Sequence, residues 1–161
     1  VADTLAQAPP GATFEVTGPL GEGFPVDHAR GRPLVLALVA SALGVARPIL
    51  RRRIADAEVS TTHVYVGVRS PADVPLPREV AGWARAGARV VLCLSRPELD
   101  EPRVLEATTR RSGWVQAVLA DDLRHARVPG AVVFAAGPAS MLDDMRELAK
   151  LTRELDVVTN V

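Results

Sequence analysis

Arginine and serine side chains directly follow two apolar runs of this chain. Arg69 comes after the run from His63 to Val68, and the pair Ser95-Arg96 comes after the run from Arg89 to Leu94. A guanidinium binds a phosphate through two parallel hydrogen bonds, and a neighbouring hydroxyl adds another. If both runs are strands that end at one edge of a sheet, these three side chains form an anion site. Taken one at a time, either arginine also fits a solvated loop charge.

A second group of candidates lies where the first apolar run meets a helical pattern. Ser41, Ala42 and Gly44 follow the run Leu34 to Ala40. Helix N-terminal amides and the positive end of the helix dipole attract anions, and glycines let the backbone approach them closely. The β-carbons of Ser41 and Ala42 narrow this approach, although Ser41 offers a hydroxyl and Arg47 a charge. A tight strand-to-helix connection without a ligand is the alternative.

A third group is the corner Ala136-Gly137-Pro138, which follows the apolar run Ala131 to Ala135. Glycine lets the backbone come close to a neighbour, and proline begins a helix without wasting an amide. The corner therefore predicts either a ligand-binding turn or a simple change from strand to helix.

Other reactive residues point to no site. The three histidines are far apart in sequence, with no pair at the spacing of metal ligands, so we expect no metal. Cys93 lies within an apolar run and is expected to be a small buried hydrophobe. Trp114 is expected to pack rather than to contact a ligand. No Ser-His-Asp order or paired-carboxylate motif is present, and we assign no catalytic residue.

The elements that must position these residues alternate between strand and helix. Nearly continuous apolar runs are typical of parallel strands covered on both faces, and the segments between them carry apolar residues at helical spacing. We predict an α/β fold, a doubly wound five-stranded parallel sheet with helices on both faces, which binds ligands beyond the carboxyl ends of its strands. The predicted strands are Leu34 to Ala40, His63 to Val68, Arg89 to Leu94, Ala131 to Ala135 and Asp156 to Val161. A further short strand is expected from Thr13 to Thr17, and a helix from Pro77 to Gly87.

Composition excludes several classes of protein. The 161 residues suit one domain. The 19 basic and 19 acidic residues balance, so the chain has no net positive charge that would attract nucleic acid. With one cysteine the chain forms no internal disulfide and no iron–sulfur site of its own. No apolar run reaches the roughly 20 residues that cross a bilayer. We expect a cytoplasmic protein that binds neither nucleic acid nor membrane.

The order of these motifs resembles the ferredoxin-NADP reductase superfamily. The loop Gly18-Pro19-Leu20-Gly21-Glu22-Gly23-Phe24 is similar to the passage between flavin and nucleotide domains in its electron-transfer subunits. Gly113-Trp114-Val115 opens a helix as a glycine, an aromatic residue and a valine do there. The chain departs from the family at Ser41 and Ala42, where glycines are usual, and at Ala136, where a cysteine is usual.

The resemblance implies a division into residues 1–33, a connector and the end of a flavin-type barrel domain, and residues 34–161, an NAD(P)-binding-like α/β domain. It implies that Gly44 and nearby amides hold the pyrophosphate of NAD or NADP, and that the corner at Gly137 and Pro138 shapes the nicotinamide pocket. Arg69, Ser95 and Arg96 would hold the adenosine part.

The implied function is delivery of a hydride to FAD or FMN held by a domain or subunit absent from this chain. The implied partners are the pyridine nucleotide, that flavin-binding part and an electron-acceptor protein. The alternative is a degenerate, non-catalytic interaction or scaffold domain, which the altered first turn and the absent thiol favour.

Overall fold

The computed structural model describes residues 2–18, 23–99, 105, 107–126, 130–152 and 155–159. Four residues of the glycine-rich loop, 19–22, lie outside this part of the chain, as do the last two residues of the predicted strand Asp156 to Val161.

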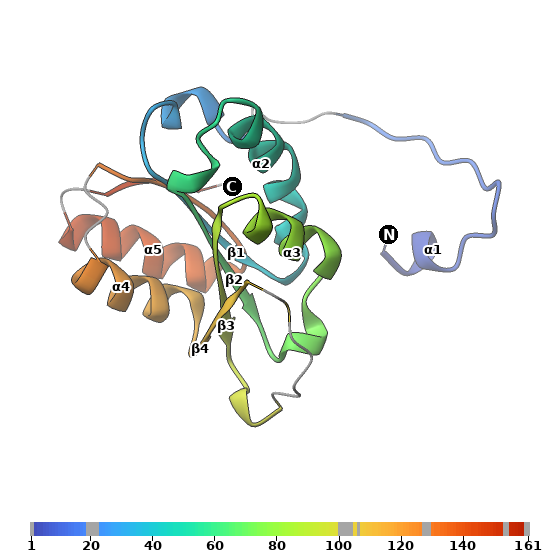
Figure 1. Ribbon diagram of the computed structural model, residues 1–161. Coiled ribbons are helices and arrows are strands. Elements are labelled where there is room, and N and C mark those ends of the chain that lie inside the picture. The colour runs from blue at the N-terminus through green and yellow to red at the C-terminus, as the bar shows by residue number, and fades with distance from the viewer. Residues whose placement is uncertain are drawn as a thin grey trace.

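The core of the fold is a six-stranded parallel sheet with the order β4-β3-β2-β1-β5-β6 (Figure 1). All five predicted strands of the α/β domain are present. The chain first builds outward from β1 to β4 and then returns to the other side of β1 with β5 and β6. The strands are β1 (Leu34–Val39), β2 (Thr62–Val68), β3 (Arg89–Leu94), β4 (Thr109–Ser112), β5 (Val132–Ala136) and β6 (Asp156–Thr159).

The prediction of five strands is corrected by β4, which pairs with β3 from Val91 to Leu94 at the edge of the sheet. Its sequence, Thr-Arg-Arg-Ser, is polar throughout and half-exposed or exposed. It carries no apolar run or alternation, because an edge strand of this kind is not covered on both faces. Hydropathy therefore gives no signal for it.

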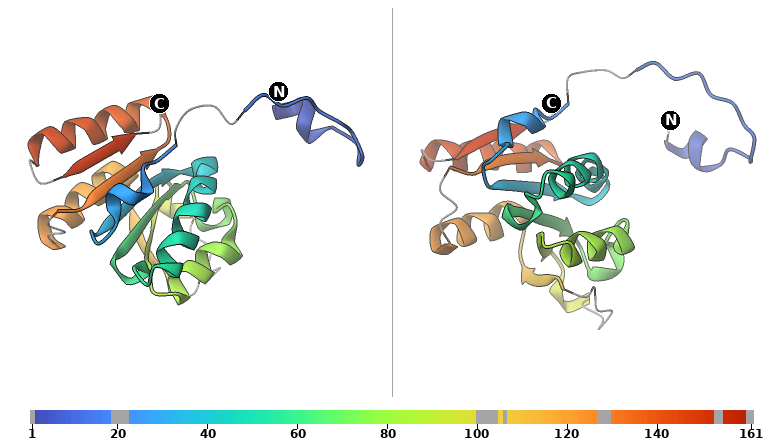
Figure 2. Two further views of the ribbon diagram at one scale, coloured as in Figure 1. Left: turned by 90° about the horizontal axis from the view of Figure 1, so that it is seen from above. Right: turned by 45° about the horizontal axis from the view of Figure 1, so that its top comes forward.

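Helices cover both faces of the sheet, as predicted (Figures 1 and 2). One hydrophobic layer joins α2 and α3 to one face, through residues such as Leu50 and Val80, and the other joins α4 and α5 to the opposite face, through Leu119 and Met145. The helix predicted from Pro77 to Gly87 is α3, and Gly87 follows its end with a φ of +109°. The helices are α2 (Ala46–Ala55), α3 (Pro77–Arg85), α4 (Val115–Ala126) and α5 (Ala139–Leu151).

The N-terminal segment extends away from the sheet (Figures 1 and 2). It contains the short helix α1 (Ala2–Ala6), and residues 12–18 form neither helix nor strand. The strand predicted from Thr13 to Thr17 is therefore wrong for this chain, because no described strand lies beside it to pair with. The chain returns to the domain at Phe24, whose ring stacks on Phe134 of β5 with centroids 4.8 Å apart.

A buried arginine ties this returning segment to the sheet. Arg53 of α2 is 2% exposed and donates hydrogen bonds to the carbonyls of Ala29 and Arg32 and to the hydroxyls of Thr61 and Thr62. Its guanidinium also pairs with Glu58. This satisfies a buried cation on every side, as burial of charge requires.

In the part of the chain that the structure describes, no helix is long and apolar enough to cross a membrane.

Candidate functional site

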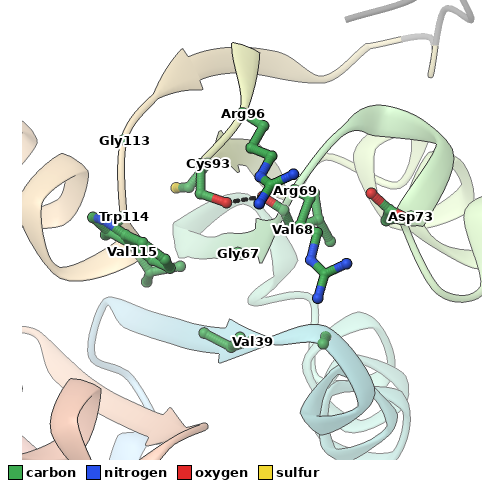
Figure 3. A pocket seen from close by; sticks show the side chains of 12 residues that line it. Val39, Gly67, Val68, Arg69, Asp73, Cys93, Arg96, Gly113, Trp114 and Val115 are labelled. Carbon is green, nitrogen blue, oxygen red and sulfur yellow. Dashed lines mark hydrogen bonds between the residues drawn. The ribbon is translucent and has the colours of Figure 1, made fainter. Parts of the chain in front are cut away.

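Three predicted site residues line one cavity of about 620 Å³ at the carboxyl ends of the strands (Figure 3). We call it the arginine cavity. Arg69 follows β2, and Ser95 and Arg96 follow β3, so the parallel arrangement of these strands brings the three residues to one edge. The other lining residues are Val39, Ala40, Gly67, Val68, Asp73, Cys93, Gly113, Trp114 and Val115.

Backbone hydrogen bonds hold the two arginines side by side. The Ser95 amide donates to the Val68 carbonyl at 3.0 Å, and the Arg96 amide donates to the Arg69 carbonyl at 3.0 Å, which continues the strand pairing past β2 and β3. Both side chains are exposed, and neither forms a hydrogen bond or ion pair with a residue that the structure describes. Two cations with free donors at the rim of a cavity suit an anionic ligand.

The other predicted site residues, apart from Gly44, line a second cavity of about 490 Å³, which we call the corner cavity. It lies where the turn after β1 meets the turn after β5, the point at which the strand order reverses. Open α/β sheets bind ligands at such a point. Ser41, Ala42, Val45, Ala136, Gly137 and Pro138 line it, together with Val39 and Ala40.

The two cavities adjoin at the end of β1. Val39 and Ala40 line both of them. Ala40 begins a 3₁₀ helix, Ala40–Val45, and has a φ of +48°, a left-handed conformation that disfavours every residue with a β-carbon. The turn therefore keeps a backbone shape that glycine normally provides, although alanine occupies the position.

Gly44 does not line either cavity. It is exposed, and a β-carbon there would meet no atom within 4 Å. The contact between Gly44 and a phosphate stays a prediction. Arg47, the other possible phosphate ligand at this turn, instead donates from Nε to Glu79 Oε2 of α3 at 2.8 Å.

Gly137 is required by packing. A β-carbon there would lie 2.7 Å from Met141 Sδ and 3.2 Å from Val39 Cβ. Gly67 of β2 is similar, because its β-carbon would lie 2.5 Å from Val115 Cγ2. The absence of both β-carbons lets Val39 pack between its neighbouring strands at the base of the two cavities.

Sequence reasoning missed Trp114 as a site residue. Its side chain was expected to pack, but it is 65% exposed and lines the arginine cavity. Its position just before α4, at the carboxyl edge of the sheet, was the available signal. Asp73 was also missed; its carboxylate accepts hydrogen bonds from the amide and hydroxyl of Ser70 and begins the turn after β2.

Cys93 is buried, as predicted, at 1% exposed. Burial raises the pKa of its thiol to about 12, with Asp122 adding to the effect, so the thiol stays protonated near neutral pH. It lines the arginine cavity as a small neutral group and is not a nucleophile.

Comparison with solved structures shows the same fold within three proteins, two of which are titled reductases. The structure titled Amycolatopsis cytochrome P450 reductase GcoB matches with a TM-score of 0.66 and 24% identity, over 89% of this chain and 43% of that one. The flavohemoglobin from Malassezia yamatoensis, solved with bound FAD and heme, matches with a TM-score of 0.60 and 17% identity, over 83% and 34%.

The third structure is the ferredoxin reductase in carbazole 1,9a-dioxygenase, with a TM-score of 0.57 and 21% identity over 87% of this chain and 41% of that one. This chain thus spans less than half the length of each match. No protein-family model matches it, and no curated protein matches it. The parallel sheet, its two helical layers and these structural matches show that the chain has the fold of the α/β domain of ferredoxin reductase-type proteins.

Proposed function

We propose that this chain is the NAD(P)H-binding domain of a flavin-dependent oxidoreductase. The observation that carries the proposal is the pair of adjoining cavities at the carboxyl edge of the sheet, of about 620 and 490 Å³. A dinucleotide consists of two nucleotides joined through a pyrophosphate, and two connected cavities with their junction at the first turn suit that shape.

The residues of the arginine cavity fit the adenosine end. Arg69 and Arg96 have free guanidinium donors for a phosphate, and Ser95, which directly precedes Arg96 at the end of β3, lines the same cavity. These groups also accommodate a 2′-phosphate, so NADP and NAD both remain candidates. Ser41 and Ala42 of the 3₁₀ helix line the corner cavity next to the shared residues Val39 and Ala40, and the backbone amides of this turn would hold the pyrophosphate.

The corner cavity would hold the nicotinamide end. Three of its lining residues, Ala42, Ala136 and Gly137, carry at most a methyl group as a side chain, and this leaves room for a flat ring. A reduced nicotinamide supplies a hydride, and the protein's own contribution is to orient the ring and to exclude water. Ala136 provides no thiol at this corner, so hydride transfer is expected to be slow.

The flavin, FAD or FMN, would belong to another domain or subunit. The structural matches are reductase-type proteins more than twice the length of this chain, which favours such a second part. Residues 1–33 would connect the two, and an electron-acceptor protein would complete the transfer. A cytoplasmic location, and the absence of nucleic-acid and membrane partners, remain predictions from composition.

Calorimetric titration of the chain with NADH and with NADPH tests the proposal. Saturable heat below about millimolar concentration supports it, and a tenfold or greater loss of affinity in Arg69→Ala and Arg96→Ala would place the phosphate. Arg78→Ala is the matched control, because Arg78 is exposed on α3 and lines neither cavity. No heat with either nucleotide, also in the presence of a flavin-bearing partner, contradicts the proposal.

The second candidate function is a non-catalytic interaction domain that keeps the fold. The position of Gly44 outside both cavities favours it, as does the methyl group of Ala136 in place of a thiol. The same titration separates the two functions, because the interaction domain predicts no nucleotide binding.

A further inference from the structure

We propose that Asp122 is a positioning residue for nucleotide binding, because it fixes α4 against the strands that carry the arginine cavity. This inference rests on the proposed function and goes further, since Asp122 lines neither cavity. It lies about two helical turns after Val115, which is the first residue of α4 and lines the arginine cavity. The two residues therefore share one face of the helix.

This face of α4 packs on the sheet and carries an acidic residue among apolar ones. Val115, Val118 and Leu119 are each at most 3% exposed, and Asp122 continues their helical spacing at 7% exposed. Burial of a carboxylate costs free energy unless the group is paired and hydrogen-bonded. Asp122 at this position therefore requires partners from the sheet.

Three neighbouring strands supply those partners. The Tyr65 hydroxyl, from β2, donates to Asp122 Oδ2 at 2.9 Å, and Arg89 Nη2, from β3, donates to the same oxygen at 3.3 Å. Arg111 of β4 donates from Nη1 to Asp122 Oδ1 at 2.6 Å and from Nη2 to Asp121 Oδ2 at 2.7 Å. One carboxylate thus ties β2, β3 and the edge strand β4 to one helix.

The same strands connect this network to the arginine cavity. Side chains alternate along a strand, so Gly67 lies on the same face of β2 as Tyr65. Gly67 lines the cavity, and a β-carbon there would lie 2.5 Å from Val115 Cγ2, so β2 and the start of α4 are closely packed. Arg111 pairs in register with Cys93, which also lines the cavity. A shift of α4 against these strands therefore changes the shape of the cavity.

The turn between β4 and α4 forms one side of this cavity. Residues 113–115 line it, and Figure 3 shows them together on one side. The Gly113 amide donates to the Leu94 carbonyl at 2.8 Å, which holds the turn to the end of β3. The ion pair of Arg111 with Asp122 joins the strand before the turn to the helix after it. Loss of this pair frees the two elements that the turn connects.

Nucleotide affinities of Arg111 variants test this role, with AMP and the tighter of NADH and NADPH as probes. We expect Arg111→Met to weaken both probes about 2- to 30-fold, the range for residues that act on a site without touching its ligand. Arg111→Lys should weaken them less, because an ammonium still pairs with a carboxylate. Tyr65→Phe removes a different partner of Asp122 and should act in the same direction, which keeps the test available if Arg111→Met does not fold.

Arg146→Met is the matched control. The Arg146 side chain is 43% exposed on α5, compared with 36% for Arg111, and it also pairs with an aspartate but lines neither cavity. Its affinity for both probes should equal that of the unmodified chain.

Amide hydrogen exchange, followed by NMR without a nucleotide, separates positioning from general stabilisation. The Gly113 amide should exchange faster in Arg111→Met than in Arg146→Met, with a smaller change in the central strand β1. An ion pair that only stabilised the whole fold would accelerate exchange at Gly113 and in β1 by the same factor.

Unchanged AMP affinity in folded Arg111→Met and Tyr65→Phe would overturn the positioning role and leave the proposed function intact. Equal acceleration of exchange at Gly113 and in β1 would also overturn it. Failure of every nucleotide to bind the unmodified chain would instead overturn the proposed function, and this inference with it.

Discussion

The buried Arg53 is expected to stabilise the fold through its hydrogen bonds. It bonds four groups besides Glu58, and two of them, the Ala29 and Arg32 carbonyls, belong to the segment that enters the domain. Arg53→Met removes the hydrogen bonds to both carbonyls and the ion pair with the Glu58 carboxylate, and we expect a loss of about 3–5 kcal/mol in the free energy of unfolding. Urea denaturation measures it.

Arg51→Met is the matched control for this change, because Arg51 is an exposed residue of the same helix. It should change the free energy of unfolding by less than about 0.5 kcal/mol. Arg53→Lys should recover little of the loss. A planar guanidinium donates to several separate acceptors from three nitrogens, whereas an ammonium has a single nitrogen and cannot reach all of them. Equal stability of Arg53→Met and Arg51→Met would show that this hydrogen-bond network does not stabilise the fold.

The left-handed Ala40 gives a second prediction at the scale of residues. With a φ of +48°, Ala40→Gly relieves the β-carbon strain and should raise the free energy of unfolding by about 0.5–1 kcal/mol. Ala42→Gly in the same 3₁₀ helix, where φ is negative, should lower it by a similar amount. Thermal denaturation distinguishes the two, and a decrease for both variants would mean that the turn carries no strain.

At the scale of elements, the segment that leads into β1, residues 24–33, is held to the edge strand β6 by two ion pairs. His28 Nε2 lies 2.5 Å from Asp156 Oδ2, and Arg32 Nη1 lies 3.2 Å from the same oxygen. The hydrogen bond from His28, with a further one from Arg32, lowers the pKa of the Asp156 carboxyl below its ordinary 3.8. The folded state therefore favours the ionised carboxylate.

A lowered pKa in the folded state stabilises the protein above the unfolded value and less as the pH falls through the folded value. We expect Asp156→Asn to reduce the urea midpoint at pH 6, and the difference from the parent to shrink as the pH approaches 3. Asp3→Asn, in the exposed helix α1, should match the parent at every pH. A constant difference for Asp156→Asn across this range would contradict the ion pair.

The more apolar a strand is, the more clearly the sequence pattern predicted it. The central strands β1, β2, β3 and β5 are buried on both faces and produce apolar runs that no loop would carry. The polar edge strand β4 left no such run. The role of Trp114 was missed for a related reason, because a lone aromatic residue before a helix has the same pattern whether it packs inward or lines a cavity.

At the scale of the whole molecule, one sheet supports both cavities, and the N-terminal segment supports neither. Residues 3–18 are exposed apart from the half-buried Ala8, and residues 13–18 make no backbone hydrogen bond to the described chain. Burial rather than sequence position determines how well a truncation is tolerated. The domain proper therefore begins near Phe24.

Removal of residues 1–17 should change the free energy of unfolding by less than about 0.5 kcal/mol. Removal of residues 1–29 should destabilise the domain strongly, because it deletes the ring stacked on Phe134 and the fully buried Ala29. Chemical denaturation of both truncated chains checks this. A large loss for the shorter truncation would show that the extended segment packs on the domain in solution.

Val39 links the two halves of the proposed site. Its Cγ2 atom lies 3.1 Å from the position of a β-carbon at Gly67, in β2, and 3.3 Å from that at Gly137, beyond β5. One isopropyl group thus lies against both neighbouring segments and lines both cavities. A substitution that changes the shape of Val39 therefore alters both cavities. Selectivity for one end of an elongated ligand then cannot evolve independently of the affinity for its other end.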